Sequence, residues 1–214
     1  MPLTKELLSD TIGKAINLSV GRNFKQSVEL LFTFSGFDKK SPEIRFRDAV
    51  LLPKGVGKSV KILVVADGGM RLNAQKLGVD TLGTDQLRNL SKRDVKRIAR
   101  KYDWFLVATE AMSLAGRILG PALGPRGKAP IPVPPQANLE LLLKQYSSCT
   151  WLRNREQNWV GCRIGMEDMS TDDLAENAMS VIEFVKSKIK RPLEGSVRIY
   201  VKTTMGPAVE VLYT

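Results

Sequence analysis

The chain has 214 residues, 43% of them hydrophobic, and its 33 Lys and Arg against 22 Asp and Glu give a formal net charge of +11. This composition can fill one large core or two small ones, and it favours a nucleic acid, an anionic membrane or an acidic protein as partner. The absence of histidine excludes Ser-His-Asp and Cys-His triads and argues against a zinc site. The sequence has no apolar run of ~18 residues and no signal-peptide core near Met1, so we expect a cytoplasmic protein with no membrane partner.

The first fifty residues predict one helix and two strands. Residues 4–18 place their apolar side chains on one helical face, and Thr4 is suited to cap the first turn. Residues 27–35 alternate, with every second residue from Val28 facing a core, which is typical of a half-buried strand. We expect residues 45–52 to form the neighbouring strand.

The middle of the chain alternates buried strands with helices. Continuous apolar runs at residues 61–66 and 104–109 are typical of strands that are covered on both faces. The predicted helices lie near residues 70–77, from Thr84 to about Lys101, and at residues 111–119. This order predicts a parallel sheet with helices on its faces, a Rossmann-like arrangement.

A glycine- and proline-rich segment, Ile118–Pro135, follows the last of these helices. It holds more than half of the chain's eleven prolines, together with Arg126 and Lys128, and it has no carboxylate. Because proline fixes φ and removes a donor, we expect a shaped loop here and neither a helix nor a central strand. Composition leaves two readings open, a polyanion-binding loop and a proline-rich linker with incidental charges.

The last third of the chain returns to a mixture of strands and helices. The predicted helices cover residues 137–146 and Ser170 to about Lys188, and the predicted strands lie near residues 149–153, 159–165, 197–203 and 208–214. The simplest organisation is an α/β protein of two domains. A discontinuous α+β outer domain would comprise residues 1–54 plus 149–214, and a Rossmann-like α/β domain, residues 55–148, would be inserted into it.

Two motifs could suggest an enzyme, and neither is complete. Residues 55–59 end like a phosphate-binding P-loop, but Leu52 stands where the first glycine is needed and the segment leads into a strand. Asp67-Gly68-Gly69 follows a strand without the GxGxxG spacing of a dinucleotide site. Cys149 and Cys162 have no metal-binding spacing. We therefore predict no enzymatic activity, no cofactor and no metal, with a nucleotide-dependent enzyme on the insert as the rejected alternative.

Positive charge is concentrated in the predicted insert. The net charge is +3 for residues 1–54, +8 for residues 55–148 and zero for residues 149–214. The densest basic run is Lys92, Arg93, Lys96, Arg97, Arg100 and Lys101. This run is either a solvated helix face or a polyanion contact.

Several motifs resemble one family. The segment LGPALGPRGKAP, the run from Thr203 to Ala208, Phe24 followed by Ser27-Val28-Glu29, and the pattern from Leu52 to Lys58 all occur in family order over nearly the full length. Together they resemble the ribosomal protein L-one family, which forms the mobile stalk beside the tRNA exit site of the large subunit. The extra Ala122-Leu123 resembles archaeal and eukaryotic members more than bacterial ones.

The resemblance implies both a fold and a site. The family has an inserted Rossmann-like domain, and its outer domain binds large-subunit ribosomal RNA (rRNA). Carried over by position, the rRNA-binding residues are Phe24, Ser27, Glu29, Thr204, Met205 and Gly206. Glu29 could accept from a ribose 2′-OH, Thr204 offers a hydroxyl, and Gly206 would let the backbone approach the RNA in an exposed turn. Auxiliary RNA contacts would be Lys25, Arg126, Lys128, Arg93, Lys96, Arg97 and Arg100.

The resemblance also implies partners. These are large-subunit rRNA within the large ribosomal subunit, the exit-site tRNA, whose release the family assists, and the chain's own messenger RNA, whose translation many prokaryotic members repress. Asn23 stands where the family often has lysine, so one phosphate contact is in question. The remaining alternative is a free-standing RNA-binding translational regulator.

Overall fold

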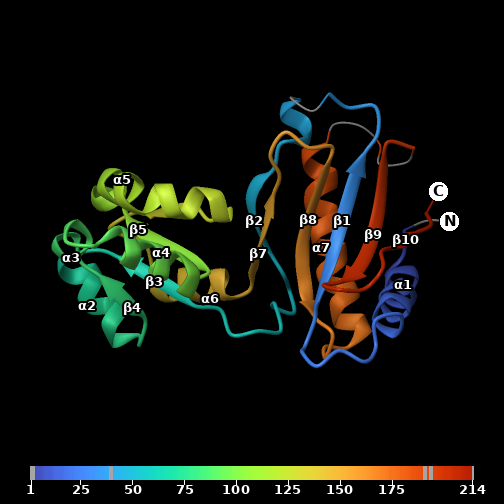
Figure 1. Cartoon of the computed structure of the whole chain (residues 1–214), viewed down its shortest axis with the longest axis horizontal. Helices are drawn as coiled ribbons and strands as arrows, with labels where there is room; N and C mark the ends of the chain where they lie inside the picture. The colour runs from blue at the N-terminus through green and yellow to red at the C-terminus, as the bar shows by residue number, and fades with distance from the viewer. Residues whose placement is uncertain (1–2, 39–40, 190–191, 193–194, 214) are drawn as a thin grey trace. The chain divides into compact units, whose positions relative to one another are not determined.

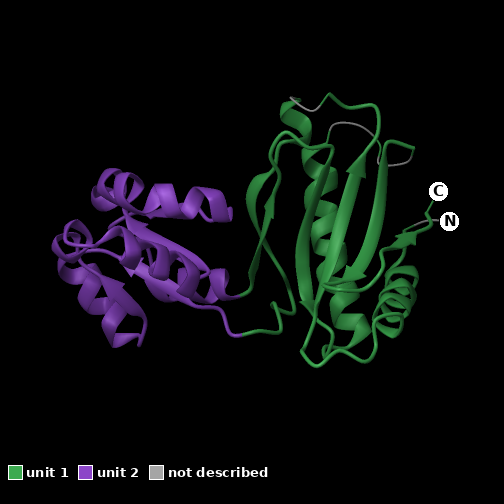
Figure 2. Cartoon of the chain, in the orientation of Figure 1, with its two compact units in different colours: residues 1–58, 148–214 green, residues 59–147 purple. Residues whose placement is uncertain are grey.

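A computed structural model describes the chain in two compact units. The described residues are 3–38, 41–189, 192 and 195–213. One unit, here the terminal unit, comprises residues 1–58 with 148–214, and the other, here the inserted unit, comprises residues 59–147 (Figure 2). The predicted mixed α/β class is confirmed, whereas the predicted division into an outer domain of residues 1–54 plus 149–214 and an inserted domain of residues 55–148 stays a prediction.

The terminal unit is built on a four-stranded antiparallel sheet with the order β10-β9-β1-β8 (Figure 1). Its strands are β1 (Ser27–Phe34), β8 (Trp159–Met166), β9 (Val197–Thr203) and β10 (Val209–Val211). Exposure along β1 alternates as predicted, with Val28, Leu30, Phe32 and Phe34 buried. The intervening side chains, Glu29 among them, are only partly covered and lie on the opposite face of the sheet.

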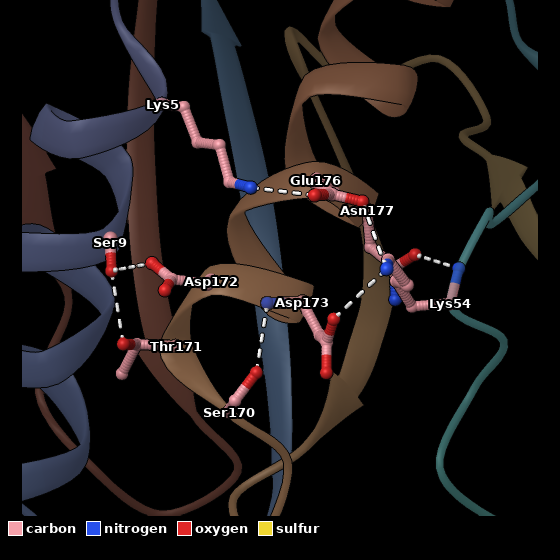
Figure 3. Close-up of polar contacts among 9 residues, drawn as sticks. All are labelled: Lys5, Ser9, Lys54, Ser170, Thr171, Asp172, Asp173, Glu176 and Asn177. Carbon is pink, nitrogen blue, oxygen red and sulfur yellow. Dashed lines mark hydrogen bonds and ion pairs between the residues drawn. The ribbon is translucent and has the colours of Figure 1, made fainter.

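Two helices pack against each other and against this sheet. They are α1 (Lys5–Asn17) and α7 (Thr171–Lys188), and each begins at the predicted cap. The Leu7 N–H donates to the Thr4 hydroxyl, and the Asp173 N–H donates to Ser170 Oγ. These bonds satisfy donors that a helix start otherwise leaves without partners. Ser9 on α1 joins Thr171 and Asp172 at the start of α7 (Figure 3).

The predicted pairing of the second strand was wrong. The strand β2 (Arg47–Leu51) pairs with β7 (Cys149–Arg153) in a separate two-stranded sheet, and not with β1. Both neighbours of β1 are already taken, by β8 and β9. Strand periodicity shows which residues are extended but does not determine their partner across a chain separation of this size.

The inserted unit contains a parallel sheet with the order β4-β3-β5-β6. Its strands are β3 (Ile62–Val65), β4 (Asp80–Leu82), β5 (Trp104–Ala108) and β6 (Pro130–Val133). Its helices are α2 (Gly68–Lys76), α3 (Thr84–Arg88), α4 (Lys92–Lys101), α5 (Met112–Leu123) and α6 (Leu139–Ser147). One core beneath α3, α4 and α5 includes Phe105 and Val107, and the other, beneath α2 and α6, includes Val64 and Leu106.

The helix predicted from Thr84 to Lys101 is in fact two helices. The first ends at Arg88, and Ser91 starts the second by accepting a hydrogen bond from the Asp94 N–H. Serine competes for backbone hydrogen bonds in a helix interior and is favoured at an N-cap. A break at Ser91 was therefore recognisable from the sequence.

The prediction that Ile118–Pro135 forms a loop was also wrong for most of this segment. The helix α5 runs through Pro121 to Leu123, a 3-10 turn covers Gly124–Arg126, and β6 begins at Pro130. Among the described residues, β6 lies at the edge of the sheet and pairs with β5 alone, so its prolines need not supply donors on two sides. Tertiary pairing overrides the expectation from composition here.

One buried side chain anchors the segment that leaves the terminal unit. Asn177 on α7 is fully buried, and its Oδ1 accepts from the Lys54 N–H at 2.9 Å (Figure 3). Its Nδ2 donates to the carbonyls of Gly55 and Ile164 at 2.9 and 2.8 Å. The Lys54 ammonium also lies 3.3 and 3.4 Å from Asp173 and Glu176. The start of the crossover is thereby held on α7.

Candidate nucleic-acid interface

The six predicted rRNA-binding residues lie in three neighbouring segments of the terminal unit. Phe24 is in the loop before β1, Ser27 and Glu29 are on β1, and Thr204–Gly206 form the turn after β9, here called turn 204–206. The strands β1 and β9 are antiparallel neighbours (Figure 1), and their register places Val28 opposite Thr203. This register brings the start of β1 directly beside the turn.

Turn 204–206 is joined to the start of β1 by side-chain and backbone hydrogen bonds of Thr204. The Ser27 N–H donates to Thr204 Oγ1 at 3.1 Å, and the Thr204 N–H donates to the Ser27 carbonyl at 3.0 Å. Lys202 Nζ donates to the Thr204 carbonyl at 3.2 Å. The Thr204 hydroxyl is therefore engaged in hydrogen bonds with Ser27 within the protein.

Sequence reasoning missed Gln26, which lies at the centre of this arrangement. Its side chain is 1% exposed, and its Oε1 accepts from the Met205 N–H at 3.0 Å. Its Nε2 donates at 3.2 Å to the Ser19 carbonyl and to Glu167 Oε2, and its own N–H donates to Glu167 Oε1 at 2.9 Å. A polar residue between the exposed Lys25 and the start of an alternating strand was the available signal, but its partners are 7, 141 and 179 positions away.

Gly206 packs closely against other parts of the terminal unit. It is partly covered, and a Cβ at this position would overlap Thr203 Oγ1 and lie 2.8 Å from Ser19 Cβ. The absence of a side chain therefore permits close packing inside the protein. A larger residue here would disturb the turn itself, so a substitution at Gly206 cannot separate RNA contact from folding.

Two apolar side chains remain exposed beside this network. Phe24 is 51% and Met205 is 58% exposed. On the partly exposed face of the sheet, Glu29 stands opposite Arg163 of β8 and Lys202 of β9, so a carboxylate lies in a row with two cations. Aromatic and thioether surfaces can pack against bases, and the neighbouring charged side chains can hydrogen-bond ribose or phosphate groups.

Lys25 lies at the same end of the sheet but already has a partner. Its Nζ is 2.6 Å from Asp168 Oδ2, on an exposed pair. The hydrogen bond between the two side chains raises the pKa of Lys25 and lowers the pKa of Asp168. An exposed pair of this kind is weak and can be exchanged for a phosphate contact.

The other predicted auxiliary residues all lie in the inserted unit, and three of them have internal partners. Arg97 lies 2.7 Å from Asp94, and Arg126 donates to the Ala122 carbonyl at 2.8 Å. Lys128 is partly buried and donates to the carbonyls of Ala99 and Tyr102, so it joins the end of α4 to the segment before β6. The side chains of Arg93, Lys96 and Arg100 are exposed on α4.

The inserted sheet also has a small pocket where nucleotides bind in many related folds. A cavity of about 270 Å³ lies beyond the carboxyl ends of the strands and is lined by Asp67, Thr84 and Glu110, among others. Asp67 accepts from the Thr84 hydroxyl at 2.5 Å and from its N–H at 3.0 Å, which lowers the pKa of Asp67. Two carboxylates in the lining oppose binding of a phosphate, and this weakens the nucleotide-dependent alternative.

The described residues contain no grouping of three His, Cys, Asp or Glu side chains that could hold a metal ion. No helix among them is long and apolar enough to cross a membrane. Cys149 and Cys162 are buried free thiols. Burial raises the pKa of Cys149 to about 11, and burial together with the charge of Glu29 raises the pKa of Cys162 to about 12.

These observations describe a mixed α/β protein whose notable polar groups organise a turn, a sheet face and a basic helix. The chain matches the Ribosomal protein L1p/L10e family over residues 15–207 and belongs to that family, whose members are structural and not enzymes. The chain is of the archaeal type, as its relatives show.

Three relatives illustrate this similarity. The large ribosomal subunit protein uL1 of Aeropyrum pernix is 49% identical over 207 residues, which cover 95% of this chain and 94% of that protein. The protein of the same name from Staphylothermus marinus is 48% identical over 214 residues, covering 99% and 100%. That of Methanothermobacter thermautotrophicus is 39% identical over 208 residues, covering 96% and 98%. The match is thus to nearly the whole of each relative.

Proposed function

We propose that the chain is a structural constituent of the large ribosomal subunit and binds large-subunit rRNA at the mobile stalk. The name of its relatives, large ribosomal subunit protein uL1, supports the assembly. The observation that carries the rRNA site is the pairing of Ser27 with Thr204, because it brings Phe24, Glu29 and Met205 to one end of one sheet.

In this proposal each part of the interface has its own task. Phe24 and Met205 present exposed apolar surface to bases that are not stacked in a regular duplex. Glu29 accepts from a ribose 2′-OH and thereby selects RNA over DNA. Ser27, Thr204 and Gly206 shape the backbone that these groups depend on, and the released ammonium of Lys25 can meet a phosphate.

The inserted unit contributes attraction without sequence readout. Arg93, Lys96, Arg97 and Arg100 lie on one exposed basic helix, and binding to phosphate depends on charge more than on base identity. Neutralising all four should reduce the salt slope of RNA binding by up to about 0.9 for each phosphate that these side chains neutralise in the parent complex. An unchanged slope would show that these side chains of α4 contact solvent and not RNA.

We further propose that the two units act as two domains and that the protein works in the cytoplasm. There it would assist release of the exit-site tRNA and repress translation of its own messenger RNA. Support for these roles comes from family membership and from a surface suited to RNA. Cofractionation with large subunits distinguishes this constituent from a free-standing translational regulator, which would sediment apart from them.

The test of the rRNA site compares two pairs of exposed apolar residues. The variant Phe24→Ala/Met205→Ala should bind a stalk rRNA fragment at least about tenfold more weakly, since one base stacked on an aromatic side chain contributes ~1–3 kcal/mol. The matched control Leu72→Ala/Leu141→Ala removes side chains that are 60% and 63% exposed in the inserted unit. Equal rRNA affinity of the test variant and the parent, with both folded, would refute the site.

A further inference from the structure

A groove on the inserted unit lies between α4 and the C-terminal half of α5. Its volume is about 480 Å³, within the range of ligand sites. The apolar lining includes Val95 on α4, and Ile118, Pro121 and Ala122 on α5. Both helices and all lining residues belong to the inserted unit, so the groove is complete within one compact unit.

Four cations surround this apolar floor. They are Lys92 and Lys96 on α4, Arg117 on α5 and Arg126 in the following 3-10 turn. All four are exposed, and within the described part of the chain no carboxylate forms an ion pair with any of them. No acidic residue lines the groove. The arrangement is an apolar channel with a positive rim, here called the basic groove.

The chemistry of the floor indicates which polyanion fits. Single-stranded RNA is bound mainly by stacking its bases on aromatic side chains or arginine planes. The floor of the basic groove has no aromatic residue and is made of aliphatic and proline side chains. Such a floor favours aliphatic anchors, as when an amphipathic helix lies in a hydrophobic groove.

We propose that the basic groove is a docking site for an acidic amphipathic helix of a partner protein. Aliphatic side chains spaced i, i+4 and i+7 would lie on Val95, Ile118 and Pro121, and carboxylates on both flanks would meet the four cations. With a rise of about 1.5 Å per residue, a helix of about 15 residues is long enough to lie along the full length of either α4, which has 10 residues, or α5, which has 12. This partner site differs from the proposed rRNA site of the terminal unit, and of the four α4 side chains proposed to attract RNA it includes only Lys96.

The experiment selects helical peptides on the full-length protein. A displayed library of peptides of about 15 residues carries leucine or alanine at the three anchor positions, and glutamate, lysine or glutamine at the flanking positions. The proposal predicts enrichment of leucine at the anchors and of glutamate at the flanks. No enrichment, or enrichment of lysine, would overturn it.

Two charge-reversed variants then locate the binding site of the selected peptide. Lys96→Glu/Arg117→Glu should weaken peptide binding by about tenfold or more. Arg93→Glu/Arg100→Glu makes the same change of charge on α4 outside the groove lining, and its effect should stay within about twofold at physiological salt. Equal losses in both variants would show attraction by the whole basic helix and would refute the groove.

A third arm tests RNA as the occupant. Fluorescent oligouridylate is titrated with the parent and with both variants, and the selected peptide is added as a competitor. If oligouridylate binding is abolished by Lys96→Glu/Arg117→Glu alone and the peptide is displaced by the RNA, the groove is a nucleic-acid site and the proposal fails. If oligouridylate binding falls equally in Lys96→Glu/Arg117→Glu and Arg93→Glu/Arg100→Glu and the RNA does not displace the peptide, RNA responds to the charge of α4 as a whole and a protein partner in the groove is supported.

Discussion

Replacing Gln26 by methionine tests whether the buried amide holds the RNA-binding turn in place. Methionine has a similar length and no strong donor or acceptor. The change removes the acceptor of the Met205 N–H and the donor to the Ser19 carbonyl and to Glu167. Ser27 and Thr204 keep their direct hydrogen bonds, so β1 and β9 should remain paired.

The expected magnitudes follow from what each former partner can do. Ser19 is buried, so its carbonyl cannot fully rehydrate, whereas Met205 is exposed and its N–H can bind water. We expect the free energy of unfolding to fall by about 2–4 kcal/mol. Freeing the backbone at Met205 costs ~1–2 kcal/mol when RNA orders it again. The rRNA affinity should therefore fall by a factor of about 5–30.

The assay measures rRNA binding well below the unfolding temperature, with urea denaturation in parallel. The matched control is Gln86→Met in the inserted unit, because Gln86 also accepts a hydrogen bond from a backbone N–H, that of Gly83 at the start of α3, at 3.1 Å. The rRNA affinity of this control should stay within about twofold of the parental value, since substitutions at sites without shared partners act independently. If Gln26→Met lowers stability and leaves the rRNA affinity at the parental value, turn 204–206 is not positioned by Gln26 for RNA and the reasoning fails.

Two further predictions concern the terminal unit. Asn177→Leu removes three hydrogen bonds from a fully buried side chain, so the free energy of unfolding in urea should fall by about 3–5 kcal/mol, and a loss under about 1 kcal/mol would contradict its anchoring role. Cys149 and Cys162 should resist alkylation in the folded protein and react in urea. The pKa values of these thiols in the folded protein, about 11 and 12, exceed the ordinary value of 9.0. The contribution of the two thiols to stability is therefore present below pH 9.0 and is lost as the pH rises towards their folded-state values. A urea midpoint that does not fall above pH 9.0 would contradict this.

Local patterns were sufficient where the responsible residues are neighbours in the chain. The alternation of residues 27–34 predicts β1 because side chains of a strand alternate between its faces. Thr4 and Ser170 predict two helix starts because each cap bonds an N–H three residues on. The motifs around Phe24 and Met205 likewise indicated one family, and the match over residues 15–207 establishes membership.

Tertiary structure decided the features that depend on distant partners. The sequence did not show that β2 would pair with β7, nor that the prolines from Pro130 would form an edge strand, because a strand's partner depends on the whole sheet. Gln26 looked unremarkable because the turn that it holds is 179 positions away. The apolar floor of the basic groove, with Val95 on one helix and Ile118 on another, likewise exists only after the two helices have packed together.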